Sequence, residues 1–222
     1  SQGNAIVIWA ESLEVPFAVY AQKLSPAGQK LWPADVRVDG APAYRTDWGP
    51  RDSLAAALDG QDNVIVVWQG SATNNWSDPD VLAQKIGPNG QRRWTNDVKV
   101  NSDSGHRQRF MAVDASSSGV SVVAWVDERN GGEDIYAQRL DSQGQRVWPS
   151  EVKVSAGAGV RLQGDPNVVL DDQTHAFVVW RQGPSDAPNE GATSTIYAQR
   201  LLSQGSLAWA GNVRINRDTA PV

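Results

Sequence analysis

The sequence predicts an all-β fold made of four repeated units, and three observations carry that prediction. A block with fixed spacing occurs four times in the 222 residues: a Gln, a Gly six positions later and a Trp four positions after the Gly. Each block follows an apolar run that ends in Trp, and no segment has the period of about 3.6 residues that indicates a helix. Four-stranded units repeated around an axis form a β-propeller.

Each unit is expected to contain four short strands joined by tight polar turns. The first strand ends on Asp in the last three units, at Asp59, Asp114 and Asp171, and the first unit lacks it. The second strand is the apolar run rich in Val and Ile, which ends at Trp9, Trp68, Trp125 and Trp180. The third strand is a YAQRL-type segment and the fourth an EVKV-type segment, with a Gly-containing turn between them.

The units are expected to form one propeller domain over residues 1–222, with repeats at about 1–40, 41–102, 103–156 and 157–216. Residues 217–222 align with the start of a further first strand, so this segment is predicted to close a four-bladed ring beside the first blade. The alternatives are that the units belong to a larger propeller, or that two chains form eight blades. Because the sequence starts in the middle of a repeat, it is interpreted as a piece of a longer protein.

The residues that recur in every unit are interpreted as scaffold. A Trp repeated in register is expected to pack one blade against the next, since burial is the default role of a large aromatic side chain. The repeated Gln lies in a buried strand and is predicted to satisfy its hydrogen bonds on neighbouring backbone. These glutamines are Gln22, Gln84, Gln138 and Gln199.

Composition argues against several classes of function. The chain has 20 basic and 25 acidic residues and no run of Lys or Arg, so nucleic acid is not a predicted partner. It contains no Cys, which removes disulfides, thiolate nucleophiles and Cys-ligated zinc. No apolar run reaches the roughly 18 residues that indicate a membrane span, so membrane insertion is not predicted.

The segment WVDERNGGEDIYAQRLDSQGQRVW, from Trp125 to Trp148, resembles the propeller repeats of bacterial secreted and surface proteins. Those units read W-x-D-x-R, then D-I-Y-A-Q-R-L-D, then Gly and Trp. The resemblance covers essentially the whole chain and implies a β-propeller; propellers host lectins, hydrolases and scaffolds alike. The turn between the third and fourth strands is also distantly similar to the Asp-box of sialidase-type propellers, although its Gly-to-Trp spacing is four rather than three.

A ligand site is predicted where the sequence departs from its repeat. Trp48 and Trp76 are the tryptophans outside the pattern, and both lie in loops of variable length expected on one face of the propeller. Aromatic rings beside planar polar groups suit a sugar, which stacks on the rings and hydrogen-bonds through its hydroxyls. The alternative is that both tryptophans anchor their own loops. The predicted ligand-binding residues are Tyr44, Arg45, Asp47, Trp48, Arg51, Asn75, Trp76 and Asp78.

Other groups of polar residues lead to no assigned site. The acidic segments 126–134 and 77–80 offer carboxylates for Ca²⁺ but lack the D-x-D-x-D-G alternation, so no cofactor or metal is predicted. His106 and His175 are expected on opposite faces, and no catalytic residue is assigned. Five arginines precede first strands and are expected along one mouth of the channel, as a solvated rim or a site for an anionic sugar: Arg51, Arg107, Arg109, Arg161 and Arg217.

The predicted function is a noncatalytic, lectin-like module of a secreted or cell-surface bacterial protein that binds a glycan or a cell-surface polysaccharide; the chain is not expected to be an enzyme. Two alternatives stay open. One is a protein-interaction or spacer propeller. The other is a glycan-processing hydrolase, which would need two carboxyl groups about 5 to 9 Å apart.

Overall fold

The computed structural model describes residues 3–11, 18–40, 54–70, 79–102, 105–156, 163–183 and 194–216. These residues form strands and turns, and none of them lies in a helix. They make four antiparallel sheets, and within each sheet the strands are neighbours in the order in which they occur in the chain. The prediction of an all-β fold with one sheet per repeat is confirmed.

The first sheet has three described strands, and the other sheets have four each. The first contains β1 (Ala5–Glu11), β2 (Ala18–Leu24) and β3 (Val36–Arg37). The second contains β4 (Leu54–Leu58), β5 (Val64–Gly70), β6 (Asp80–Ile86) and β7 (Val98–Lys99). The third contains β8 (Gln108–Ala115), β9 (Ser121–Asp127), β10 (Asp134–Leu140) and β11 (Val152–Lys153). The fourth contains β12 (Gln163–Leu170), β13 (Ala176–Gln182), β14 (Thr195–Leu201) and β15 (Val213–Arg214).

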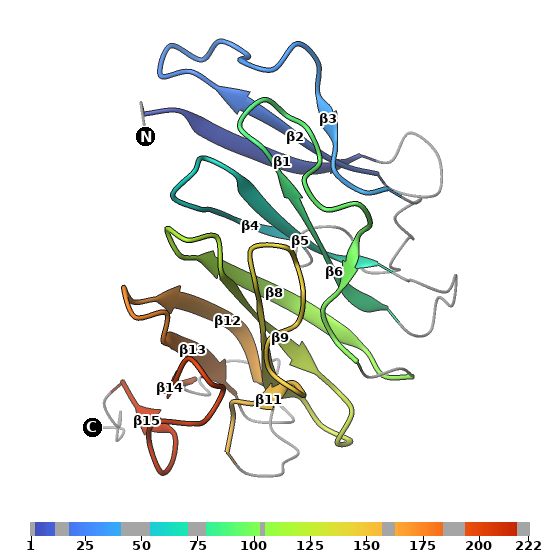
Figure 1. Ribbon diagram of the computed structural model, residues 1–222. Coiled ribbons are helices and arrows are strands. Elements are labelled where there is room, and N and C mark those ends of the chain that lie inside the picture. The colour runs from blue at the N-terminus through green and yellow to red at the C-terminus, as the bar shows by residue number, and fades with distance from the viewer. Residues whose placement is uncertain are drawn as a thin grey trace, which may run out of the picture.

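The sheets follow one another as the blades of a propeller, with the first and fourth at opposite ends of the row (Figure 1). The first strands of the second, third and fourth sheets are the innermost, and β8 packs beside both β4 and β12. Ala220 to Val222, which are expected to form the strand that closes the ring, lie outside the described residues.

Hydrophobic cores lie between neighbouring sheets. Ile65 and Val67 of β5 pack with Val123 and Trp125 of β9 in the joint between the second and third sheets. Similar clusters join the first sheet to the second and the third to the fourth. All residues of β5 and β9 are therefore buried, whereas buried and exposed positions alternate along most of β13. Each unit completes its core against its neighbours, as the repeat predicts.

Each repeated Gln ties the third strand of its sheet to the turn that follows. The Oε1 atom of Gln138 accepts hydrogen bonds from the backbone nitrogens of Arg139 at 2.8 Å and Trp148 at 3.2 Å. Its Nε2 donates to the carbonyl oxygen of Trp148 at 3.2 Å. The predicted backbone-bonding role is confirmed here, and the same pattern occurs at Gln22 and Gln199. Gln84 accepts the same two backbone bonds, but its Nε2 donates to the carbonyl oxygen of Asn96.

The Trp of the same block joins its sheet to the next one. The ring lies against the Gly of the following block: a Cβ atom added to Gly144 would lie 2.8 Å from the ring of Trp94. In three joints the indole nitrogen also donates to a carbonyl oxygen of the next sheet: Trp32 to Pro88, Trp94 to Ser142 and Trp148 to Ser203. The prediction that these tryptophans pack blade against blade is confirmed.

The turn after β8 corrects the predicted alignment of the first strands. The backbone nitrogen of Ser116 bonds to the carbonyl oxygen of Val120, as those of Asp59 and Asp171 bond to the residue four positions later. Ser116 is thus their counterpart, and Asp114 lies two positions too early. The carboxylate of Asp114 instead accepts the backbone N–H of Leu170 in the fourth sheet at 2.7 Å.

Candidate functional site

We call the end of the propeller where β5, β9 and β13 finish and β6, β10 and β14 begin the loop face, because the sequence assigns its variable loops to these connections. The opposite end, which carries the short turns, is the turn face. In the described part of the loop face, charged side chains gather over the third sheet. They are Arg109, Asp127, Glu128, Arg129, Glu133 and Asp134.

Asp127, at the end of β9, is the buried centre of this group. Its carboxylate accepts hydrogen bonds from the indole nitrogen of Trp125 at 3.0 Å and from the guanidinium of Arg129 at 2.6 and 2.8 Å. Burial opposes ionisation, but the bonds from Arg129 and Trp125 outweigh it and hold the pKa of Asp127 below its usual value. The W-x-D-x-R pattern thus forms a fixed ion pair that supports the β9–β10 loop.

Arg129 extends this support to the neighbouring sheet. Its guanidinium lies 4.3 Å from the ring centroid of Tyr136 and 3.5 Å from the carboxylate of Glu151. Glu151 in turn accepts a hydrogen bond from the hydroxyl of Ser102 in the second sheet at 2.8 Å. Burial opposes ionisation of Glu151, but its hydrogen bonds outweigh burial and lower its pKa. The largest of these effects comes from the backbone N–H of Ser102. The start of the β9–β10 loop is therefore anchored to two sheets.

Two carboxylates of this anchored loop converge on Arg109, at the opening of the innermost strand β8. The Nη2 atom of Arg109 lies 3.2 Å from Oε1 of Glu128 and also contacts Oε1 of Glu133. All three side chains reach solvent, with exposed fractions of 23% for Arg109, 34% for Glu128 and 12% for Glu133. We call these residues the Arg109 cluster. It holds two carboxyl groups close together where a solute can approach them.

A β-bulge sets the position of Arg109. The pairing of β8 with β9 shifts between Arg109 and Ala112, and Phe110 has a φ of 51°, in the left-handed region. A bulky residue in that region costs about 1–3 kcal/mol, and such bulges often re-aim side chains next to active sites. The guanidinium of Arg109 lies 5.0 Å from the ring centroid of Phe110. The strained backbone therefore lies directly beside the charged cluster.

The neighbouring innermost strand repeats this bulge. The pairing of β12 with β13 shifts after Gly164, and Asp165 also has a φ of 51°. Asp165 occupies the position that corresponds to Phe110, because both strands open with a Gln paired to the last residue of the next strand. Its side chain is 61% exposed, with the carboxylate 3.0 Å from Nε of Arg181. A third carboxyl group thus lies at the corresponding position of the adjacent innermost strand.

All the residues predicted to bind a ligand lie outside the described residues, so their placement stays a prediction. They are Tyr44, Arg45, Asp47, Trp48, Arg51, Asn75, Trp76 and Asp78. Five arginines were expected along one mouth of the channel; of these, Arg109 is ion-paired with Glu128 and Glu133 and does not form a solvated rim. The pairing of Arg109 with Val126 places Arg109 beside the acidic loop, and no pattern in the sequence indicates that pairing.

The carboxylates considered for Ca²⁺ are engaged by protein groups. Asp127 binds Arg129, and Asp134 lies 2.8 Å from the ammonium of Lys153. In the other segment Asp80 lies 2.7 Å from the ammonium of Lys99, and residues 77–78 are outside the described part. Among the residues that the structure describes, no group of three or more His, Asp or Glu side chains is arranged to hold a metal ion.

A cleft of about 540 Å³ lies on the turn face, between the second and third sheets. Gln61, Lys85, Trp94 and Ser142 are among its lining residues. Lys85 is already committed to Asp59, with their charged atoms 2.7 Å apart and both side chains almost fully buried. The cleft is therefore a polar recess built on a structural ion pair, at the opposite end from the Arg109 cluster.

No protein-family profile and no curated protein sequence matches the chain, but solved structures do. The GH93 α-L-arabinofuranosidase of Fusarium graminearum, in complex with arabinobiose, has a TM-score of 0.62 and 13% identity over 97% of this chain and 64% of that one. The fold is that of a β-propeller. The α-L-arabinanase of Penicillium chrysogenum, also with arabinobiose, has a TM-score of 0.57 and 12% identity over 96% of this chain and 63% of that one. The α-L-arabinanase of Cellvibrio cellulosa has a TM-score of 0.50 and 12% identity over 93% of this chain and 73% of that one.

These similarities correct the predicted function. The propellers that match are named for the cleavage of arabinose-containing sugars, which contradicts the prediction of a noncatalytic, lectin-like module and of a chain that is not an enzyme. They support a propeller-type repeat in general, and not the Asp-box type. This chain spans less than two thirds of the length of the first two structures. No described segment is a helix of the length and apolarity needed to cross a membrane.

Proposed function

We propose that this chain is a glycan-processing hydrolase whose reaction takes place at the loop face. The observation that carries the proposal is the convergence of Glu128 and Glu133 on Arg109 at the opening of β8. The similar arabinofuranosidase and arabinanase structures support it, because they place a sugar-cleaving chemistry on the same fold.

The chemistry of glycoside cleavage needs two carboxyl groups on either side of the bond that breaks. One donates a proton to the glycosidic oxygen, while the other either attacks the anomeric carbon or activates a water molecule. The two groups stand about 5 to 5.5 Å apart for direct attack and about 6.5 to 9.5 Å apart when water lies between them. Glu128 and Glu133 come from one anchored loop, and Arg109 supplies a permanent positive charge between them.

The substrate we propose is a polysaccharide with arabinofuranosyl units, handled outside the cell. Furanosyl rings carry hydroxyls that the guanidinium of Arg109 can bind once a substrate enters the cluster. The loop residues Trp48 and Trp76 would add stacking surfaces for neighbouring sugar units on the same face. A secreted or cell-surface location fits a polymeric substrate, which cannot enter a cell intact.

The test is hydrolysis of linear arabinan, arabinobiose and a 4-nitrophenyl α-L-arabinofuranoside by the purified chain and by two variants, Glu128→Gln and Glu133→Gln. On arabinobiose each variant should lower kcat by about 10²-fold or more, the range for loss of a general acid or base. Nitrophenolate leaves without a proton, so the variant that lacks the acid should keep most of its activity on the nitrophenyl substrate. The other variant should lose activity on both.

A matched control is Asp172→Asn, an exposed acid in the β12–β13 turn on the turn face. It should hydrolyse arabinobiose at the wild-type rate, and the thermal unfolding midpoint of each variant should show that it is folded. If the wild-type chain releases no sugar from any substrate of the panel, the proposed activity is wrong. If both Gln variants are as active as Asp172→Asn, the proposed site is wrong.

A further inference from the structure

The fourth sheet has an apolar face that the described part of the chain leaves uncovered. Phe177 and Val179 of β13 are 37% and 39% exposed. Their counterparts in β5, Ile65 and Val67, are fully buried against the third sheet. The ring of Trp209 packs against the edge of Phe177, with centroids 6.3 Å apart, and extends this surface. The exposed side chains Val213 and Ile215 extend the apolar surface of the fourth sheet further.

Within the described part of the chain, the first sheet is likewise uncovered, on its opposite face. Val7 of β1 is 43% exposed, while its counterparts are fully or almost fully buried against the preceding sheet: Val66, Val123 and Val178. The turn that follows β2 is uncovered as well. A Cβ atom on Gly28 would meet nothing within 4 Å, whereas one on Gly144 or Gly205 would strike the Trp of the preceding sheet.

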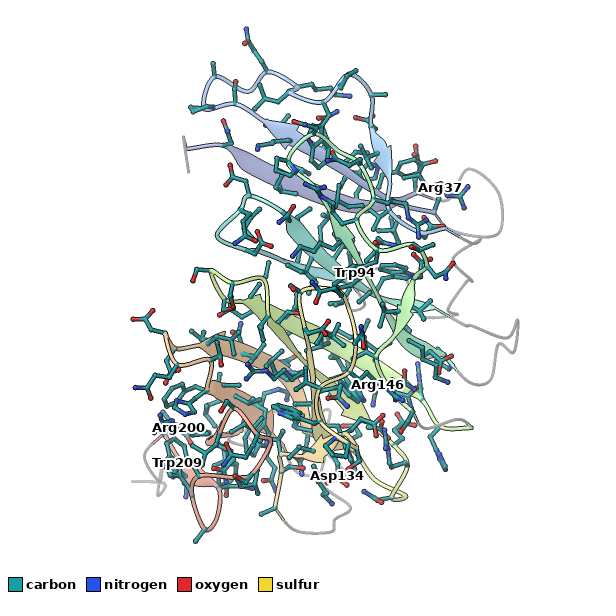
Figure 2. The ribbon with its side chains drawn as sticks, in the orientation of Figure 1. Arg37, Trp94, Asp134, Arg146, Arg200 and Trp209 are labelled. Carbon is teal, nitrogen blue, oxygen red and sulfur yellow. The ribbon has the colours of Figure 1, made fainter. Side chains whose placement is uncertain are left out.

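The two faces carry the two halves of the joint that links the inner sheets. Trp209 corresponds to Trp148, the indole donor of the third sheet. Trp209 lies at the end of the row of sheets, whereas Trp94 lies within the row (Figure 2). Pro26 follows Gln22 by four positions, as the acceptor Ser203 follows Gln199. The fourth sheet therefore supplies the donor side of a joint, and the first sheet supplies the acceptor side.

A second contact of the inner joints, a carboxylate that accepts a backbone N–H, also has its acceptor in the first sheet. The carboxylate of Asp97 in the second sheet accepts the backbone N–H of Gly40 from the first sheet at 2.8 Å. Asp35 holds the corresponding position in the first sheet, where its carboxylate is 37% exposed and lies 2.9 Å from the ammonium of Lys30. The acceptor side of the joint thus includes a carboxylate as well as a carbonyl group and a glycine.

We propose that the fourth sheet of one copy of this chain docks on the first sheet of a second copy and repeats the inner joint. The indole of Trp209 would donate to the carbonyl oxygen of Pro26 and lie over Gly28, while Phe177 and Val179 cover Val7. The contact joins two different surfaces, so it is heterologous, and each copy keeps one free face until the assembly closes or continues. This inference is independent of the proposed hydrolysis.

Sedimentation or light scattering of the 24.0 kDa chain over a range of concentrations tests the proposal. We expect masses at multiples of the monomer that grow with concentration. Val7→Asp and Val179→Asp each place a charge on one of the two faces at an exposed position, and each variant alone should therefore stay monomeric. Val147→Asp, an equally exposed valine in the third sheet, should associate as the wild type does.

An equimolar mixture of Val7→Asp and Val179→Asp distinguishes head-to-tail docking from a symmetric contact. Each variant retains the face that the other has lost, so the mixture should recover a dimer. A constant mass of 24.0 kDa for the wild type would overturn the proposal and mean that both faces are covered within one chain. Association that survives Val7→Asp, or a mixture that stays monomeric while the wild type associates, would also overturn it.

Discussion

The indole nitrogen of Trp148 and the carbonyl oxygen of Ser203 lie 3.0 Å apart and join the third sheet to the fourth. The same bond joins the second sheet to the third and the first to the second. The repeat that is visible in the sequence is therefore a repeat of joints between sheets as much as a repeat of sheets.

Trp148→Phe should destabilise the fold because it removes the indole donor while it keeps most of the apolar ring. The carbonyl oxygen of Ser203 keeps its second hydrogen bond, from Nη1 of Arg139 at 3.3 Å. We therefore expect the free energy of unfolding in urea to fall by about 0.5–1.5 kcal/mol, the net contribution of one hydrogen bond. Trp209→Phe, compared at a concentration at which the chain is monomeric, is the control, since in the described residues the Trp209 indole makes no bond to another sheet. A loss as large for Trp209 as for Trp148 would contradict this account.

Two glycines with the same backbone conformation should respond differently to Ala. Gly144 and Gly28 have φ angles of 84° and 76°, so both substitutions incur the strain of a left-handed residue. At Gly144 the added methyl group also meets the ring of Trp94, which should lower the free energy of unfolding by about 1–3 kcal/mol more. Urea unfolding of Gly144→Ala and Gly28→Ala measures the difference, and equal losses would show that the ring adjusts freely.

Lys85→Met should be far more damaging than Lys23→Met, although both lysines follow the repeated Gln. Lys85 and Asp59 are almost fully buried with their charges 2.7 Å apart, so loss of the lysine strands a buried carboxylate at a cost of about 3–5 kcal/mol. Lys23 lies 3.7 Å from the half-exposed Asp62, and such a pair contributes about 1 kcal/mol or less. Thermal unfolding midpoints of the two variants provide the comparison.

Asp127 should contribute stability that disappears in acid. Its pKa is lower in the folded chain than in the unfolded chain, so the unfolded state binds its proton first as the pH falls. Its contribution is complete above the unfolded value of about 3.9 and is lost as the pH drops through the folded pKa. The gap in unfolding free energy between the wild type and Asp127→Asn should therefore be constant near neutral pH and narrow below about pH 4. If the difference in unfolding free energy between the wild type and Asp127→Asn does not change with pH, ionisation of Asp127 does not cause it.

The fold was predictable because its signals are local and repeated. The buried Gln138 and Trp148 recur with constant spacing, and a residue that recurs in every unit meets the same neighbours each time. The same reasoning failed at Asp114, where an Asp happens to lie two residues before the true turn residue, Ser116. A single-letter match cannot fix a register that is set by backbone hydrogen bonds.

The Arg109 cluster was not predictable in the same way, because it joins a strand residue to two residues of a separate loop and does not repeat. Arg109 was assigned to the rim arginines, and Glu128 and Glu133 belong to the acidic segment 126–134 that was considered for Ca²⁺; only the pairing of β8 with β9 brings them together. The bulge at Phe110 recurs at Asp165, but the two positions share no residue type that marks the bulge in the sequence. Features that depend on one sheet alone have to be read from the structure.

Among the described residues, the clusters of apolar side chains couple each sheet to the sheets on either side of it. Energetically such a molecule behaves as a short one-dimensional chain of coupled elements, whose stability is a sum of unit and nearest-neighbour terms. Unfolding should then begin at a terminal sheet, which has one neighbour instead of two, and proceed toward the inner sheets. The fourth sheet, with Phe177 and Val179 in water, should exchange its amide hydrogens sooner than the third.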